Sequence, residues 1–188
     1  MCLLTLLTVW TSSPEAASAL PNSPEALVRS LYKQVVARHP LGIPYGEDEK
    51  VFAPYLSKTL LHRFDLNNAC GADWHRQYPD PNLKPPGVFE DGIFSGSSEQ
   101  AEPKAFSIGR TEVESDGVSR VHVKLTWEDA SNAPMTWYVA AVVGRENGRP
   151  VVEDVLFLKD DDRKIEARLS KMLASGCDGP RWVGDGAK

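Results

Sequence analysis

The stretch that most limits the fold is 120–128, where apolar and polar residues alternate without a break from Val121 to Trp127. Successive side chains of a β-strand leave opposite faces of a sheet, so this alternation predicts a half-buried antiparallel strand. The preceding segment, 105–114, also has strand character, and Asp116 and Gly117 separate the two segments. An Asp-Gly pair in this position predicts a tight hairpin, so we expect the two strands to be paired neighbours.

Two further strands follow at hairpin spacing. The segment 136–143 is apolar on both faces, which is typical of a strand covered from both sides. Asn147 and Gly148 then predict a second tight turn into 151–158. Because the doubly apolar strand must be covered by this chain or by another copy, a homodimer is one possible arrangement.

Helices are expected before and after these strands. Ser23 and Pro24 are typical of a helix start, and an apolar stripe continues to His39-Pro40. Helical spacing also predicts a short helix from Glu47, a second main helix over 55–67 and a closing helix over 163–174, with the acids 160–162 as caps. Four prolines argue against a regular element over 71–102, apart from a possible edge strand at 89–95. The predicted fold class is α+β: N-terminal helices packed on a curved antiparallel sheet of about four to five strands, with a C-terminal helix.

The first 19 residues resemble a secretory signal peptide, with a short apolar core and a small-residue site at Ala17-Ser18-Ala19. No Lys or Arg precedes Leu3, so either the leader is atypical or translation starts upstream. The remaining residues, 20–188, are expected to form a single domain. We therefore predict a periplasmic or secreted protein without stable membrane insertion, since the apolar core is too short to span a bilayer. The net charge of −5 argues against a nucleic-acid partner.

Cleavage after Ala19 would remove Cys2 and leave Cys70 and Cys177. An even pair of cysteines in an exported chain predicts one disulfide, Cys70 to Cys177. The alternative is two buried free thiols.

Several of these features together resemble the nuclear transport factor 2-like superfamily, and more narrowly its uncharacterised secreted bacterial branches. The resemblance covers about residues 24–175 and rests on the first helix, Tyr55-Leu56-Ser57, Glu102-Pro103, the strand 137–143 and Glu153-Asp154-Val155. It implies a cone-shaped α+β fold, which hosts enzymes, binding modules and scaffolds alike, so it assigns no function by itself.

Candidate site residues come from the last strand and from aromatic positions. Strand alternation places Glu153 and Asp154 on opposite, otherwise apolar faces, so at least one is expected beside buried surface, where an unpaired carboxyl group can act as a general base. Pairing with an arginine such as Arg110 is the alternative. Tyr55, Trp127 and Tyr138 are candidates to line a ligand pocket, and Asp91 is a candidate for its mouth.

The histidines offer no metal-ligand spacing. His62 and His75 flank acids and Cys70 but would need an additional convergence to bind a metal, so no metal or cofactor is predicted. His122 is expected to be a solvated strand residue.

No nucleophile elbow, phosphate-binding glycine loop or zinc-protease motif occurs in the sequence. We therefore expect an exported, non-catalytic protein that binds a small ligand or a protein partner. One alternative is a small-molecule hydrolase or isomerase that uses Asp154 or Glu153 as general base. Another is an immunity or inhibitor protein that neutralises a toxin.

Overall fold

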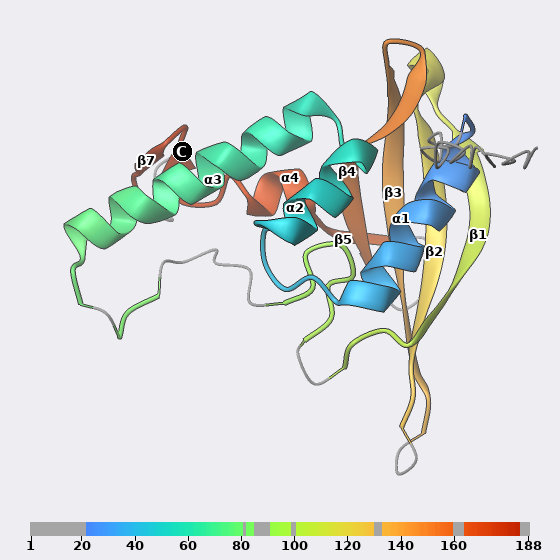
Figure 1. Ribbon diagram of the computed structural model, residues 1–188, viewed down its shortest axis with the longest axis horizontal. Helices are drawn as coiled ribbons and strands as arrows, with labels where there is room; N and C mark the ends of the chain where they lie inside the picture. The colour runs from blue at the N-terminus through green and yellow to red at the C-terminus, as the bar shows by residue number, and fades with distance from the viewer. Residues whose placement is uncertain are drawn as a thin grey trace, which may run out of the picture.

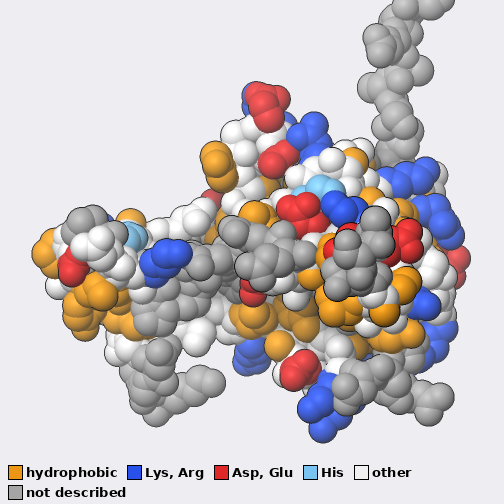
Figure 2. Space-filling model, turned by 90° about the horizontal axis from the view of Figure 1, so that it is seen from below, with side chains coloured by type: hydrophobic (Ala, Val, Ile, Leu, Met, Phe, Trp, Pro, Cys, Tyr) orange, Lys and Arg blue, Asp and Glu red, His pale blue; other side chains and the backbone are white. Residues whose placement is uncertain are grey.

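The computed structural model describes residues 22–80, 82–84, 91–98, 101–129, 133–159 and 164–184, and its elements form one α+β arrangement (Figure 1). Among these residues, no helix has both the length and the apolar character needed to cross a membrane. On the face of the molecule shown in Figure 2, basic and acidic side chains are interspersed. The helices are α1 (Pro24–Arg38), α2 (Glu47–Phe52), α3 (Lys58–Gln77) and α4 (Leu169–Met172), with 3-10 turns η1 (Ala53–Tyr55) and η2 (Ser115–Gly117). The strands are β1 (Ala105–Val113), β2 (Ser119–Trp127), β3 (Met135–Glu146), β4 (Arg149–Lys159), β5 (Lys164–Arg168), β6 (Cys177–Asp178) and β7 (Arg181–Trp182).

The large sheet is an antiparallel meander in the order β1-β2-β3-β4-β5. The four predicted strands and both predicted hairpins are confirmed. Asp116 and Gly117 adopt positive φ in the first turn, and Asn147 and Gly148 do so in the second. Turns of this kind match the right-handed twist of the strands they join, which explains why these short signals predicted the pairing.

One face of the sheet carries the main core. In β2 the odd-numbered residues Val121, Val123 and Leu125 are fully buried on this face, as the alternation predicted. Helix α1 packs against them along the stripe that includes Leu27 and Leu31. The predicted start of α1 is confirmed, since the Ser23 hydroxyl accepts a hydrogen bond from the Ala26 amide.

The opposite face of the sheet carries a second, smaller apolar cluster. Residues of β3 and β4 alternate between the two faces, so both strands are apolar on both sides. The second cluster consists of Ala140, Leu156 and Leu158, with Tyr138, Val142 and Ile165 packed against them.

The loop 91–98 closes the open end of the main core. Ile93 and Phe94 are buried in it, and the Phe94 ring lies 5.1 Å from that of Phe52 in α2. The Tyr32 hydroxyl donates a hydrogen bond to the Phe94 carbonyl at 2.8 Å, and the Trp137 indole N–H donates to the Ser95 carbonyl at 2.8 Å. Burial raises the pKa of Tyr32, so this hydroxyl stays protonated as a donor. The loop is therefore fixed from both α1 and β3.

Three expectations for the rest of the chain differ from the structure. Helix α3 starts after the Ser57 cap and continues past Gly71 to Gln77, because buried Cys70 and Trp74 anchor its distal half. The predicted closing helix is reduced to the four residues of α4, since Lys164–Arg168 pairs with β4 as a fifth strand. The described part of the suggested edge strand, 91–95, is a turn with one bridge from Gly92 to Leu41. The leader, the acids 160–162 and residues 89–90 lie outside the described residues.

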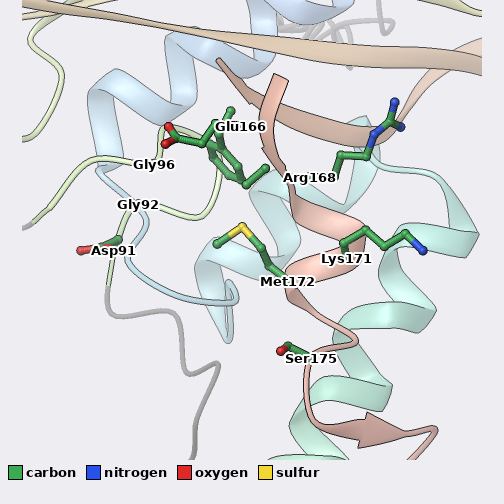
Figure 3. Close-up of a pocket in the computed structure, with 10 residues that line it drawn as sticks. Asp91, Gly92, Gly96, Glu166, Arg168, Lys171, Met172 and Ser175 are labelled. Atoms are coloured by element: carbon green, nitrogen blue, oxygen red, sulfur yellow. The ribbon is translucent and has the colours of Figure 1, made fainter. Parts of the chain in front are cut away.

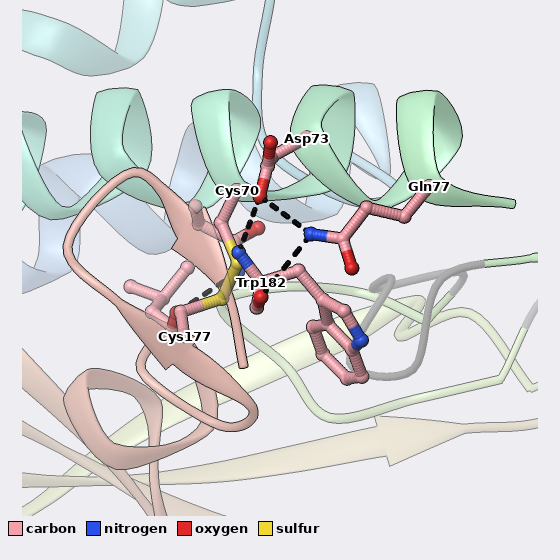
Figure 4. Close-up of a disulfide and its surroundings, with 7 residues drawn as sticks. Cys70, Asp73, Gln77, Cys177 and Trp182 are labelled. Carbon is pink, nitrogen blue, oxygen red and sulfur yellow. Dashed lines mark hydrogen bonds between the residues drawn. A yellow bond between two sulfur atoms is a disulfide. The ribbon is translucent and has the colours of Figure 1, made fainter. Parts of the chain in front are cut away.

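Cys70 and Cys177 form a disulfide, as predicted, and it joins α3 to the small β6–β7 hairpin (Figure 4). Asp73 lies one turn beyond Cys70, and its carboxylate accepts a hydrogen bond from the Trp182 amide at 2.9 Å. This hydrogen bond is the main reason why the pKa of Asp73 lies below its ordinary value. Gln77 donates a further bond to the Trp182 carbonyl at 3.3 Å, so the hairpin is fixed along the distal half of α3.

The Tyr32 bond gives a first prediction. Tyr32→Phe removes the donor and leaves the buried Phe94 carbonyl unpaired, which should lower the free energy of unfolding by about 1 to 3 kcal/mol. Tyr45→Phe is the matched control: because Tyr45 is 84% exposed, this variant should have the free energy of unfolding of the unmodified protein. Urea denaturation of the three proteins measures both values, and equal stabilities would contradict the role given to this bond.

The disulfide gives a second prediction. It closes a sequence separation of 107 residues, so its loss should cost about 4 to 5 kcal/mol in the chain-entropy model. We expect this loss when urea denaturation is repeated with reductant. The double variant Cys70→Ala/Cys177→Ala should have the lower free energy of unfolding without reductant and should not change when reductant is added. A change in the double variant would show that the reductant acts on stability by another route than this disulfide.

Candidate functional site

A groove lies beside β5 and α4, at the end of the sheet that the loop 91–98 covers. It consists of two cavities of about 660 Å³ and about 310 Å³. Both are lined by Gly96, Phe157 and Glu166, so they adjoin. The larger cavity is further lined by Asp91, Gly92, Ala167, Arg168, Lys171, Met172 and Ser175, and the smaller by Ser95, Ser97, Ser98, Ala101, Met135, Thr136, Trp137, Tyr138, Val139 and Leu158.

Close contact between the loop and β4 shapes the middle of the groove. Gly96 has a φ of +66°, and a Cβ atom built on it would lie 2.7 Å from Cδ1 of Phe157. Only glycine combines this backbone conformation with such an approach. The Phe157 ring thus lies against the loop backbone, and Phe157 lines both cavities.

The charged side chains of the larger cavity are separated by sign. Figure 3 shows the carboxylates of Asp91 and Glu166 on one side of Met172, and Arg168 and Lys171 extending from the other side. Within the described part of the chain, neither carboxylate makes a side-chain hydrogen bond or an ion pair, whereas Arg168 Nη1 lies 3.9 Å from Asp154 Oδ2. The larger cavity therefore combines apolar lining residues with an acidic edge on one side and a basic edge on the other.

The four predicted ligand-binding residues separate into two pairs. Asp91 and Tyr138 line the groove, although the Tyr138 ring packs with the apolar cluster on the opposite face of the sheet. Trp127 ends β2 and Tyr55 packs half-buried against the main core, and neither lines the two cavities. The structure brings together the first pair only.

Asp154 lies on the face of the sheet opposite the main core, since it pairs with Val142 across β3 and β4. It is 7% exposed, and its carboxylate accepts hydrogen bonds from the Val155 amide, the Ser170 amide and the Ser170 hydroxyl at 2.7 to 2.9 Å. These bonds fix the first turn of α4 against β4. The partner of Asp154 among the arginines is Arg168; Arg110 instead binds Glu112.

The expectation that Glu153 and Asp154 lie on opposite faces is wrong. The register shifts between Val142 and Val143, so Glu153 is the extra residue of a β-bulge. A Cβ atom on Gly144 would lie 1.9 Å from Glu153 Oε1, which places this carboxylate over Gly144, on the same face as Asp154. Neither acid lines the groove.

His122 is buried at 2% exposure, so the expectation of a solvated strand residue is also wrong. Its Nε2 lies 3.5 Å from Glu112 Oε2, and Arg120 Nη1 lies 3.4 Å from the same oxygen. The Arg110 guanidinium, with His122 as a weaker contributor, holds the pKa of Glu112 below its ordinary value. This ion-pair network covers the histidine on the β1–β2 part of the sheet.

His62 and His75 are both exposed on α3. Across the described ranges, no three His, Cys, Asp or Glu side chains gather closely enough to hold a metal ion.

Sequence reasoning missed Trp137, Phe157 and Glu166. Alternation along β3 and β4 contained the signal for the first two, because Trp137 shares a face with Val139 and Phe157 pairs with Val139. Glu166 has no such signal, because it is the unpaired residue of a second bulge, between the pairs Phe157–Ala167 and Leu158–Ile165.

The two acids of β4 give a third prediction. Asp154→Ala leaves the Ser170 amide and hydroxyl without their acceptor, so the free energy of unfolding should fall by about 1.5 to 3 kcal/mol. Glu153→Ala is the neighbouring control and should change it by less than about 0.5 kcal/mol. Thermal and urea denaturation measure the stability of both variants. A larger loss of stability for Glu153→Ala than for Asp154→Ala would contradict the structural role given to Asp154.

The chain was also compared with known proteins. No protein-family model matches it, and neither a curated protein nor a solved structure is significantly similar to it. The functional argument therefore depends on the geometry of the groove.

Proposed function

We propose that this chain is an extracytoplasmic, non-catalytic binding protein that takes a small, largely apolar ligand in the groove beside β5 and α4. The observation that carries the proposal is the pair of adjoining cavities with an apolar floor and a loop wall fixed by the hydrogen bonds from Tyr32 and Trp137. The volume of the larger cavity, about 660 Å³, lies in the range usual for small-molecule sites.

The fixed wall matters because a site that is already formed binds without an ordering cost. Ser95 and Ser97 bond to each other through their hydroxyls at 2.7 Å, and the Gly92 amide donates to the Ser97 carbonyl at 2.7 Å. The loop is thus braced internally as well as from Tyr32 and Trp137. This rigidity favours a pre-formed ligand site over a loop that folds upon a protein partner.

Binding is favoured over catalysis by the position of the candidate bases. Asp154 has three hydrogen-bond donors on its carboxylate and lines neither cavity, so it is poorly placed to take a proton from a bound ligand. Glu153 lines neither cavity either.

The compartment is argued from the disulfide. Disulfides form and persist in oxidising compartments, and the Cys70–Cys177 bond fixes the C-terminal hairpin to α3. A periplasmic or secreted location agrees with this bond and with the leader-like first 19 residues.

A neutral apolar dye, Nile red, tests the groove and gives a fourth prediction. We expect dye fluorescence to rise on binding to the protein. Ala167→Trp should reduce the affinity for the dye at least tenfold, because Ala167 lines the larger cavity beside its cross-strand partner Phe157. Ala105→Trp is the matched control: it also lies on an edge strand, but at the far side of the sheet, and should bind as before. Equal loss in both variants, or no dye binding to the unmodified protein, would contradict the proposal.

A further inference from the structure

We propose that the ligand is an organic cation, an amine or quaternary ammonium group on an apolar body, with its charge held in the smaller cavity between Glu166 and the aromatic walls. This inference rests on the proposed function and narrows it to one chemical class. The argument comes from three features of the groove: an unpaired carboxylate, two aromatic side chains and the uneven distribution of charge.

The carboxylate is that of Glu166. It is the one charged residue among those that line the smaller cavity, and it also lines the larger one. The bulge in β5 leaves it out of the pairing with β4, and in Figure 3 its side chain extends from β5 toward the loop at Gly96. Bulges commonly re-aim a side chain at a functional site. Within the part of the chain that is described, no cation lies within ion-pair distance of Glu166, so its charge is available to a ligand.

The aromatic walls are Trp137 and Phe157. Both lie on the face of the sheet that the helices cover, and both are only partly buried. The hydrogen bond from the Trp137 indole to Ser95 fixes one ring, and contact with Gly96 fixes the other. The face of an aromatic ring attracts a cation, so two oriented rings beside a carboxylate form a site that selects a positive charge with apolar substituents.

The basic residues of the groove do not cancel this preference. Arg168 Nη1 lies 3.9 Å from Asp154 Oδ2, and Lys171 extends away from the two carboxylates (Figure 3). Both line the larger cavity only, where Asp91 provides a second carboxylate. Glu166 is the one charged residue that lines both cavities, so a ligand cation in the smaller cavity meets a carboxylate and no basic lining residue.

Calorimetric titration of the full-length protein with three related probes tests the charge preference: phenylethylamine, its neutral N-acetyl derivative and 3-phenylpropionate. We expect the amine to bind at least tenfold more tightly than the neutral probe, and the anion to bind most weakly. Glu166→Gln should bring the amine to the level of the neutral probe without changing the affinity for the neutral probe. Glu153→Gln is the matched control, because Glu153 lies on the face of the sheet opposite Trp137 and Phe157. This variant should leave all three affinities unchanged.

The outcomes separate this inference from the proposed function. If the neutral probe or the anion binds as tightly as the amine, or if Glu166→Gln has no effect, the cation assignment is wrong while the groove remains a ligand site. The same holds if none of the three probes binds although Nile red binds and Ala167→Trp prevents it. If neither the probes nor Nile red bind, the proposed function itself fails.

Discussion

Hydrogen bonds to two consecutive carbonyls of one loop hold the site together. Tyr32 reaches the Phe94 carbonyl from α1, and Trp137 reaches the Ser95 carbonyl from β3. Segments far apart in sequence meet at this point, so the bonds couple the first helix, the loop and the middle of the sheet. With the loop fixed, Ile93 and Phe94 close the core on one side, while its glycines and serines face the groove on the other. The core and the proposed site thus share one wall.

Much of this architecture could be predicted from the sequence, because it follows from local pattern. The alternation of 121–127, the turns at Asp116 and Asn147 and the capped start of α1 each depend on residues close in the chain. The disulfide was predictable for a different reason, since the expected cleavage after Ala19 would leave only Cys70 and Cys177. Of the four candidate ligand-binding residues, Asp91 and Tyr138 line the groove, and Tyr55 and Trp127 do not.

The remainder depends on contacts that local pattern does not encode. The extra residue of each bulge is an acid, Glu153 in β4 and Glu166 in β5. A bulge changes the face of the sheet on which such a side chain lies, so strict alternation predicts the wrong face. The first half of the predicted closing helix became β5 because its residues pair with β4, a tertiary interaction that overrides helical spacing. The loop 91–98 has no periodicity at all, and its conformation follows from the Tyr32 and Trp137 bonds.

The position of Cys177 gives the disulfide a meaning beyond stability. Met172 and Ser175 line the groove, and Cys177 follows directly along the chain, tied to Cys70 in α3. The segment that completes one wall is therefore tied at its end to α3 by a covalent bond, in addition to the hydrogen bonds of Asp73 and Gln77. Oxidation of the two cysteines thus concerns the wall of the proposed site as well as the stability of the chain: in a reduced chain, packing and hydrogen bonds alone would hold Met172 and Ser175 in that wall.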